Sequence, residues 1–181
     1  MVKFRWKREG IILLIAVFII VVDQITKHWI RTTLAAGESF PPLGPLTIIH
    51  IQNTGSAFGL FSNQTAVLSI IALAGLIAMI CFYPYVSHIA SWGGFSLALI
   101  FAGAAGNLID RIFRGNVTDF IYVRLWDDIY WPAFNIADSS ITIGTIILAL
   151  SVVLTMQKEN KGCSSEGNKN ISDQRTIDPP R

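Results

Sequence analysis

Residues Gly103 to Asp138 read GAAGNLIDRIFRGNVTDFIYVRLWDDIYWPAFNIAD, and the rest of the chain is organised around them. The stretch runs from the last turns of one very apolar segment, across a loop that contains charged residues, into the start of the next apolar segment. Asp119 and Asp138 stand where these two apolar segments meet the loop. The remaining chain can be interpreted as the means of holding these two acids at the boundary of an apolar layer.

The composition is that of an integral membrane protein. Of the 181 residues, 52% are hydrophobic and 14% are charged, and the mean hydropathy is +0.52, which lies outside the range of soluble globular proteins. A bilayer core of about 30 Å is crossed by about 20 helical residues. Four segments are long and apolar enough: Ile11 to about Ile30, Ala66 to about Tyr85, Phe95 to about Ile112, and Ile136 to about Met156. We therefore predict an all-α integral membrane protein with four transmembrane helices.

The first apolar segment, with basic residues before it and small residues at 34–37 after it, has some features of a cleaved signal peptide. However, Asp23, Lys27 and Arg31 separate the apolar run from the small residues. A cleavage site would therefore lie too far from the apolar run, and we predict a retained helix.

The distribution of charge predicts the orientation in the membrane. Four of the 14 Lys and Arg residues precede Ile11 and five follow Met156, whereas the loop at 86–94 has none. Four spans place both termini on the same side, and the positive-inside rule places them in the cytoplasm. The loops at 31–65 and 113–135 then face outward. The net charge of +2 is too small to indicate nucleic-acid binding.

Two further segments complete the predicted organisation. Leu46 to Gln52 is dominated by β-branched residues, which predicts a small β-sheet in the first outer loop, residues 31–65. The following segment, residues 53–61, combines turn residues with Phe58, Leu60 and Phe61, a composition suited to the lipid interface. Residues 157–181 are polar and lack an apolar period, which predicts a disordered cytoplasmic tail. The transmembrane domain is therefore expected to span residues 1–156.

Ionisable residues in the apolar segments are candidates for a functional site. Asp23 and Lys27 are four residues apart and share one helix face. Such groups cost roughly 2.5–3.5 kcal/mol each at membrane depth and usually face a bundle interior or a polar cavity. They could form a pair that only ties the first helix to its neighbours, or act near a substrate; both interpretations remain open. Asn107, Asp110 and Arg111 can line one face of the third helix, whose Gly and Ala residues favour close helix packing.

The spacing of His, acidic and Ser residues along the sequence gives little support for a metal site or a covalent nucleophile. The three His residues are scattered and form no zinc-ligand pattern. The acids at 110, 119, 127, 128 and 138 match no calcium or magnesium loop motif. Ser139 or Ser140 could serve as a nucleophile only if Lys27 approached it through space, an alternative that the sequence leaves open.

Paired carboxylates remain the main candidate for catalysis. Two acids within a few ångströms cannot both ionise cheaply, so they share a proton near neutral pH. One member can then activate water and the other can protonate a leaving amine, which is worth about 10²–10⁴-fold in rate. Asp119 and Asp138 lie among apolar residues that would raise a carboxyl pKa. The alternative is that Asp138 caps the fourth helix and Asp119 caps a turn, and spacing alone favours these caps.

Four blocks of the sequence combine charged, amide and glycine residues at fixed spacings. They are Asp23-Gln24-Xaa-Thr26-Lys27; Asn53-Thr54-Gly55-Xaa-Ala57-Phe58; Gly106-Asn107-Xaa-Xaa-Asp110-Arg111 with Gly115 and Val117-Xaa-Asp119-Phe120; and Trp131-Pro132-Ala133-Phe134-Asn135-Xaa-Ala137-Asp138-Ser139. Together they resemble the signal peptidase II family, the bacterial lipoprotein signal peptidases. The blocks occur in the family's order, and the resemblance covers about residues 22–144.

The resemblance implies an aspartic endopeptidase of the bacterial cytoplasmic (inner) membrane whose active site faces outward. It would cut prolipoproteins on the amino side of the diacylglyceryl-cysteine, with Asp119 and Asp138 as catalytic dyad and without a cofactor or metal. Membrane lipid and globomycin-type inhibitors are implied partners, and a mobile segment at 57–61 is implied over the site. The supporting residues would be Asp23, Lys27, Asn53, Gly55, Asn107, Asp110, Arg111 and Asn135.

A proton-coupled transporter is the main alternative from another class. It would place ionisable residues along a path through the bundle. Here they cluster at the outer end, and the inner halves of the second, third and fourth segments have none. This asymmetric distribution of ionisable residues favours a catalytic site at the outer end over a proton pathway through the bundle. A membrane phosphatase or lipid transferase would need a metal or a covalent nucleophile, for which the sequence gives no pattern.

Overall fold

The structure is a computed structural model that describes residues 6–41, 44–55, 64–89, 92–127 and 129–177, with side chains described between residues 8 and 158 of these ranges. The described part forms four helices and four strands: α1 (Trp6–Thr33), β1 (Ser39–Phe40), β2 (Leu46–Asn53), α2 (Thr65–Ile89), α3 (Gly93–Arg114), β3 (Val117–Trp126), β4 (Ile129–Phe134) and α4 (Ile136–Ile177). Each predicted apolar segment is a helix long and apolar enough to cross a membrane. The prediction of four membrane-spanning helices is confirmed.

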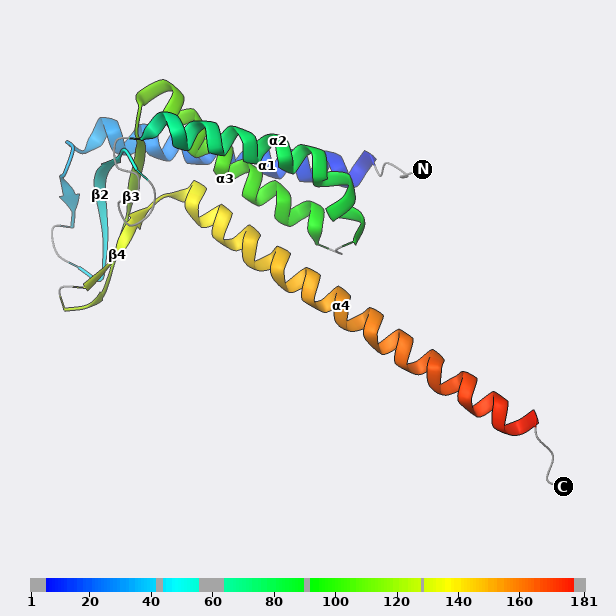
Figure 1. The fold of residues 1–181 in the computed structure, drawn as a ribbon. Coiled ribbons are helices and arrows are strands. Elements are labelled where there is room, and N and C mark those ends of the chain that lie inside the picture. The colour runs from blue at the N-terminus through cyan, green and yellow to red at the C-terminus, as the bar shows by residue number, and fades with distance from the viewer. Residues whose placement is uncertain (1–5, 42–43, 56–63, 90–91, 128, 178–181) are drawn as a thin grey trace.

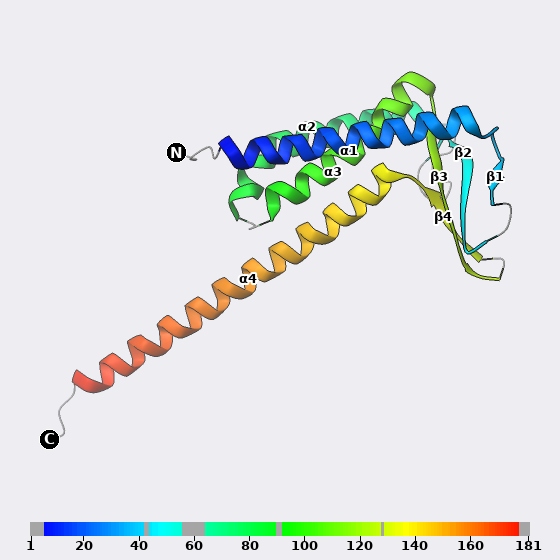
Figure 2. The ribbon, with the colours of Figure 1, turned by 180° about the vertical axis from the view of Figure 1, so that it is seen from behind.

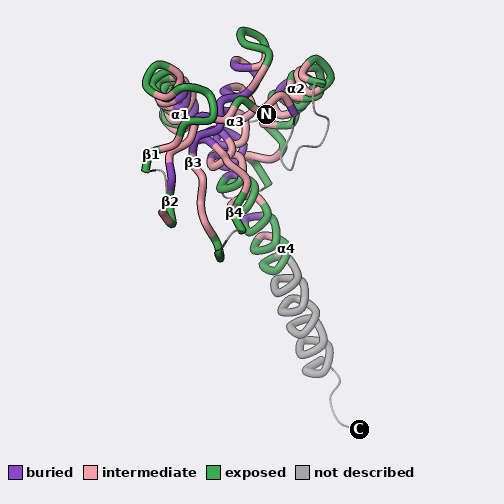
Figure 3. The backbone as a smooth tube through the Cα atoms, turned by 90° about the vertical axis from the view of Figure 1, so that its left-hand side faces the viewer, coloured by how far each residue is buried: buried purple, intermediate pink, exposed green. Residues whose placement is uncertain are grey.

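Helix α3 is the central helix of the bundle (Figures 1 and 2). More than half of its apolar window, 56%, is buried, against 17% or less for the other three helices. In Figure 3 the buried residues gather around α3 and the start of β3. Large apolar side chains on α1 and α2, such as Phe18 and Phe82, are exposed. Exposed apolar faces on both sides of a buried helix are what a bundle surrounded by lipid requires.

Helices α3 and α4 approach each other closely where α4 begins. A Cβ atom added to Gly103 would stand against the carbonyl oxygen of Ala137 and 2.5 Å from the Ser140 hydroxyl. One added to Gly144 would lie 2.8 Å from the carbonyl oxygen of Ser96. The predicted close packing of the small residues of α3 is therefore confirmed, and it sets the position of the first turns of α4.

The sheet is larger than the sequence predicted. The four strands pair antiparallel in the order β1-β2-β3-β4, so the loops at 31–65 and 113–135 both contribute, whereas we predicted strands only within 31–65. Strand β2 pairs with β3, with Ile51 opposite Asp119. Val117 to Val123 is itself rich in β-branched and aromatic residues, but a loop between two apolar spans obscured its strand character. The pairing brings these two loops together beside the start of α4.

The backbone after residue 156 also differs from the prediction. It continues α4 as a helix to Ile177, where we predicted a disordered tail. Met156, Gln157 and Lys158 are good helix formers, and no Gly or Pro lies between Met156 and Gly162, so nothing ends the helix at the end of the span. The segment apolar enough to cross a membrane ends at Lys158. The domain boundary at residue 156 stays a prediction.

The sheet and the termini lie at opposite ends of the bundle. In Figure 1 the strands lie at the left end of the bundle, and the first turn of α1 and the last turn of α4 lie towards the right. Both termini are therefore on the same side, as four spans require. Phe58, Leu60 and Phe61, predicted to contact lipid, and the segment at 57–61, predicted to be mobile, lie outside the described residues.

Candidate active site

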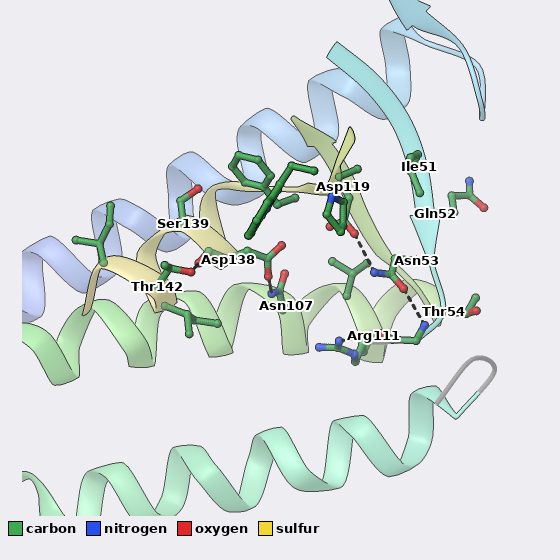
Figure 4. A pocket seen from close by; sticks show the side chains of 18 residues that line it. Ile51, Gln52, Asn53, Thr54, Asn107, Arg111, Asp119, Asp138, Ser139 and Thr142 are labelled. Carbon is green, nitrogen blue, oxygen red and sulfur yellow. Dashed lines mark hydrogen bonds between the residues drawn. The ribbon is translucent and has the colours of Figure 1, made fainter. Parts of the chain in front are cut away.

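A cavity of about 750 Å³ lies where β2, β3, α3 and the start of α4 meet. Its polar lining includes Asn53, Asn107, Arg111, Asp119 and Asp138. Figure 4 shows Asp119 and Asp138 in this cavity, one on β3 and the other on α4. The structure thus brings together the two carboxylates that the sequence singled out.

Asp119 is the third residue of β3, and its side chain is almost completely buried, with 3% exposure. Its Oδ2 accepts a hydrogen bond from Asn53 Nδ2 at 3.0 Å, and its Oδ1 accepts one from Asn135 Nδ2 at 2.7 Å. The interpretation that Asp119 caps a turn is therefore wrong. The residue sits within a strand, and two amides from different parts of the chain hold its carboxyl group.

Asp138 combines a structural contact with a position in the cavity. The backbone N–H of Asp138 donates to Asn135 Oδ1 at 2.9 Å, and the backbone N–H of Asn135 donates to Asp138 Oδ2 at 3.2 Å. This reciprocal pair is a capping box in which Asn135 is the cap and Asp138 is the third helical residue. The cap interpretation placed the cap on the wrong residue. The second oxygen, Oδ1, accepts from Asn107 Nδ2 at 2.7 Å.

Two asparagine side chains connect the two carboxylates. Asn135 Nδ2, which donates to Asp119, also lies 3.2 Å from Asn107 Oδ1, and Asn107 Nδ2 donates to Asp138. Lys27 Nζ donates to Asn107 Oδ1 at 2.8 Å. An ammonium group has donors and no acceptor, so Lys27 fixes which end of the Asn107 amide points toward Asp138.

A fully buried set of charges supports these amides. Lys27 Nζ lies 2.9 Å from Asp23 Oδ2 and 3.2 Å from Asp110 Oδ2, and all three side chains have 0% exposure. Asp23 Oδ1 accepts a hydrogen bond from the backbone N–H of Ala137 at 3.0 Å, which anchors the start of α4 on α1. The pair therefore ties helices together, as the first interpretation of Asp23 and Lys27 has it, and Lys27 also reaches the amide that holds Asp138. A role near the substrate stays a prediction.

Arg111 and Gly55 also line the cavity, next to Asn53. Arg111 Nη2 donates to the carbonyl oxygen of Gly55 at 3.4 Å, and the N–H of Gly55 donates to Asn53 Oδ1 at 2.9 Å. This chain of contacts orients the Asn53 amide so that its nitrogen faces Asp119. The Arg111 guanidinium itself lines the cavity (Figure 4).

Burial is the main cause that raises the pKa of Asp119 to about 7, and the negative charge of Asp138 adds to the rise. Hydrogen bonds from Asn53 and Asn135 and the charge of Lys27 oppose it. A carboxyl group with this pKa can keep a proton at neutral pH and release it during a reaction. Asp119 and Asp138 can therefore work as a pair that holds one proton.

The alternative with a serine nucleophile does not fit the geometry. The Ser139 hydroxyl donates to the carbonyl oxygen of Asn135, and the Ser140 hydroxyl donates to those of Leu99 and Ala137. The contacts of Lys27 go to Asp23, Asn107 and Asp110. Within the described ranges, no group of three or more His, Cys, Asp or Glu side chains could hold a metal ion.

Sequence reasoning missed Arg31, Arg114 and Thr118, which also belong to this cluster. Arg31 and Arg114 both pair with Asp110, and Thr118 lies between Arg31 and Asp119. Arg31 follows Asp23 and Lys27 at a spacing of four residues, which places all three on one helix face. This spacing could have indicated from the sequence that Arg31 belongs to the cluster.

Comparisons with known proteins agree on one family. The family model for Signal peptidase (SPase) II matches residues 15–154. The chain is 39% identical over 154 residues to the lipoprotein signal peptidase of Staphylococcus aureus, covering 84% of this chain and 94% of that protein. The lipoprotein signal peptidase of Staphylococcus aureus strain Newman matches to the same extent.

Two solved structures, described as bacterial membrane enzyme structures by the in meso method at 2.3 Å and 1.9 Å resolution, have similar folds. The first has a TM-score of 0.73 and 37% identity and covers 82% of this chain and 91% of its own. The second has a TM-score of 0.68 and 38% identity and covers 79% and 92%. The chain therefore belongs to the signal peptidase II family, the aspartic peptidases of family A8 that cleave the signal peptides of prolipoproteins.

Proposed function

We propose that Asp119 and Asp138 are the catalytic dyad of this lipoprotein signal peptidase and that it cuts on the amino side of the diacylglyceryl-cysteine. One observation carries the proposal: two carboxylates from different elements face one cavity and are linked through the side chains of Asn107 and Asn135. An acid pair of this kind can hydrolyse a peptide bond with water alone.

The dyad performs the reaction with one shared proton. Asp138 lies in the first turn of α4, where the helix dipole and N–H donors from Asn107 and Asn135 stabilise a negative charge. It takes a proton from a water molecule, whose oxygen attacks the scissile carbonyl carbon. Asp119 gives its proton to the leaving nitrogen as the carbon–nitrogen bond breaks. The signal peptide leaves with a new carboxyl group, and the cysteine keeps a free amino group.

Arg111 and Asn53 serve the charged intermediate. As the water adds, negative charge develops on the former carbonyl oxygen, and positioned N–H donors stabilise such charge. The Arg111 side chain lines the same cavity as both carboxyl groups, one helical turn after Asn107 on α3. Asn53 donates to Asp119 Oδ2 at 3.0 Å, which holds the carboxyl group of the proposed proton donor in place.

The position of the cavity supports the proposed substrate class. The cavity lies at the sheet end of the bundle and is lined by apolar side chains such as Trp131, Phe134 and Ile143. A signal peptide is an apolar helix, and its lipidated cysteine lies at the membrane surface, so its scissile bond reaches this level while its acyl chains stay in lipid. Prolipoproteins, membrane lipid and cyclic peptides of the globomycin type are the expected ligands, and the site faces outward from the bacterial inner membrane.

The test is a cleavage assay in detergent with a diacylglyceryl-modified prolipoprotein and excess chelator. We expect Asp119→Asn and Asp138→Asn to fold and to lose at least about 10³-fold in kcat, because each removes one half of the acid–base pair. Asp127→Asn is the matched control, since Asp127 is an exposed carboxylate in the turn after β3. Turnover of either dyad variant near that of the control would show that this acid is only structural.

A further inference from the structure

Thr118 immediately precedes Asp119 in β3, and each of its three polar groups has a partner on a different element. Its backbone N–H donates to Asp110 Oδ2 at 3.3 Å. Its carbonyl oxygen accepts from Asn135 Nδ2 at 3.3 Å. Its hydroxyl accepts from Arg31 Nη1 at 2.9 Å. The residue is fully buried, so α1, α3 and the start of α4 all hold this point of the strand.

Arg31 is the partner that reaches Thr118 from α1. Its Nη1 also lies 3.4 Å from Asp110 Oδ1, and its side chain is 15% exposed. The other terminal nitrogen, Nη2, is buried without a hydrogen-bond partner among the described residues. A buried cation with few partners is costly, and it keeps its position only while its existing contacts are in place.

Asp110 is shared by four donors. Lys27, Arg31 and Arg114 lie 3.1–3.4 Å from its oxygens, and the N–H of Thr118 is the fourth. Lys27 in turn orients Asn107, which holds Asp138. Arg31 is therefore connected to both carboxyl groups. One series of contacts leads through Thr118 to Asp119, and the other leads through Asp110, Lys27 and Asn107 to Asp138.

We propose that Arg31 and Thr118 form a positioning pair that fixes where the Asp119 carboxyl stands relative to Asp138. The inference rests on the proposed dyad and assigns to these two residues no contact with substrate. The hydroxyl of Thr118 anchors the strand from the side opposite to Asp119, because successive side chains of a strand point to opposite faces. Losing the anchor lets the Asp119 backbone move, and a displacement of about 1 Å can cost 10²-fold in rate.

A positioning role predicts an effect on turnover and little effect on substrate binding. Thr118→Val removes only the hydroxyl and keeps the shape of the side chain. We expect kcat to fall about tenfold and KM to stay within about twofold, because the cavity lining is unchanged. Thr118→Ser keeps the hydroxyl and should restore most of kcat. Arg31→Lys keeps the charge but loses the planar fork, and it should lower kcat in the same way.

Two controls separate positioning from general stability. Thr32→Val removes a hydroxyl that, among the described residues, bonds to its own helix, at the carbonyl oxygens of His28 and Trp29. We expect no change in kcat for this variant. In a double-mutant cycle, Arg31→Gln with Thr118→Val should cost little more in kcat than Arg31→Gln alone, since Arg31→Gln already breaks the contact with Thr118 as well as the one with Asp110. Melting temperatures of all variants show whether turnover is lost without loss of the folded state.

The assay includes Asp119→Asn, so the two proposals can fail separately. If Asp119→Asn is inactive while Thr118→Val and Arg31→Lys keep wild-type kcat, the positioning pair is refuted and the dyad stands. If Thr118→Val raises KM rather than lowering kcat, the positioning role is also refuted. If Thr118→Val does not fold, the comparison of Arg31→Lys with Thr118→Ser tests the proposal: a lower kcat in the first and a nearly normal kcat in the second support it, and a wild-type kcat in Arg31→Lys refutes it. If Asp119→Asn itself is active, the proposed dyad fails, and the inference fails with it.

Discussion

Each oxygen of the two proposed catalytic carboxyl groups accepts an N–H hydrogen bond. Asp119 accepts from Asn53 and Asn135, and Asp138 accepts from Asn107 and from the backbone of Asn135. Neutral amides can hold a carboxyl group in place without adding a full charge. The single proton of the pair is therefore governed mainly by burial and by the mutual repulsion of the two acids.

The rate of cleavage should depend on pH through Asp119. Its pKa is raised to about 7 by burial and by Asp138, and the charges that face it are Asp138, Lys27 and Arg111. Above pH 7 the proton needed by the leaving nitrogen is lost. We expect kcat/KM to fall about tenfold for each pH unit above about pH 7, measured by initial rates between pH 5 and 9.

The pH profile of Asn53→Ala tests whether the descending limb belongs to Asp119. The Asn53 hydrogen bond lowers the pKa of Asp119, so its removal should move the descending limb to higher pH while kcat at the optimum also decreases. A profile that stays flat to pH 9, or a limb that moves to lower pH in Asn53→Ala, would contradict the assignment of the proton to Asp119.

The same raised pKa makes a prediction for stability. Asp119 has an ordinary pKa of 3.8 and a folded-state pKa of about 7, so the folded state binds its proton more tightly than the unfolded state. This contribution is fully present below about pH 4 and is lost as the pH rises through 7. Asp119→Asn has no charge to bury. Its melting temperature relative to wild type should therefore rise between pH 4 and 8.

The difference in free energy of unfolding between Asp119→Asn and wild type should change by at most about 1.4 kcal/mol per pH unit. Asp127→Asn is the control, and we expect no trend with pH for it, since Asp127 is exposed. Thermal melts in detergent at a series of pH values make the comparison. A difference between Asp119→Asn and wild type that is constant or shrinks with pH would show that Asp119 is charged in the folded protein at low pH.

At the scale of elements, the contact between α3 and α4 sets the site. Asn107 on α3 and Asp138 on α4 are joined by a 2.7 Å hydrogen bond, which requires the two helix axes to be close. Gly103 and Gly144 permit this, because a side chain at either position would overlap the facing helix. Small residues at helix interfaces are the usual means of close packing in membranes.

Gly103→Ala should therefore impair both stability and catalysis. The new Cβ would overlap Ala137 and Ser140, so α4 must move away from α3, and overpacking of this kind costs about 1–3 kcal/mol. The shift lengthens the Asn107 to Asp138 bond and lowers kcat. Gly75→Ala on α2 is the control, because a Cβ there meets nothing within 4 Å. Equal melting temperatures and rates for the two variants would refute the proposed constraint.

At the scale of the whole molecule, the described sheet lies at the end of the bundle away from both termini (Figure 1). The polar cluster and the cavity lie at the sheet end. A protein with this shape can present its site to only one side of the membrane, so orientation decides which substrates can reach it.

Cysteine labelling in intact cells tests the orientation. In a background with Cys81→Ser and Cys163→Ser, we expect Ala35→Cys to react with a membrane-impermeant reagent and Lys158→Cys to react only after permeabilisation, following the positive-inside rule. Both positions are exposed. The reverse pattern would place the site on the cytoplasmic side and would exclude the proposed location of cleavage.

The sequence by itself determined the four spans, the shared side of the termini and the residues to examine. These properties are local. A long apolar segment specifies a membrane helix because lipid offers no hydrogen bonds to unpaired backbone N–H and C=O groups. An acidic residue within an apolar segment can be recognised however the helices pack. The motif blocks placed the two acids in a known family, although spacing alone favoured helix and turn caps for Asp138 and Asp119.

Only the tertiary structure decided how these residues act together. Asp23 bonds to Ala137 across 114 positions of the chain, and Arg31 bonds to Thr118 across 87. The pairing of β2 with β3, and the assignment of the helix cap to Asn135 rather than Asp138, depended equally on packing. Contacts between distant residues arise because each buried polar group must find a partner, and which partner it finds depends on the packing of the whole bundle.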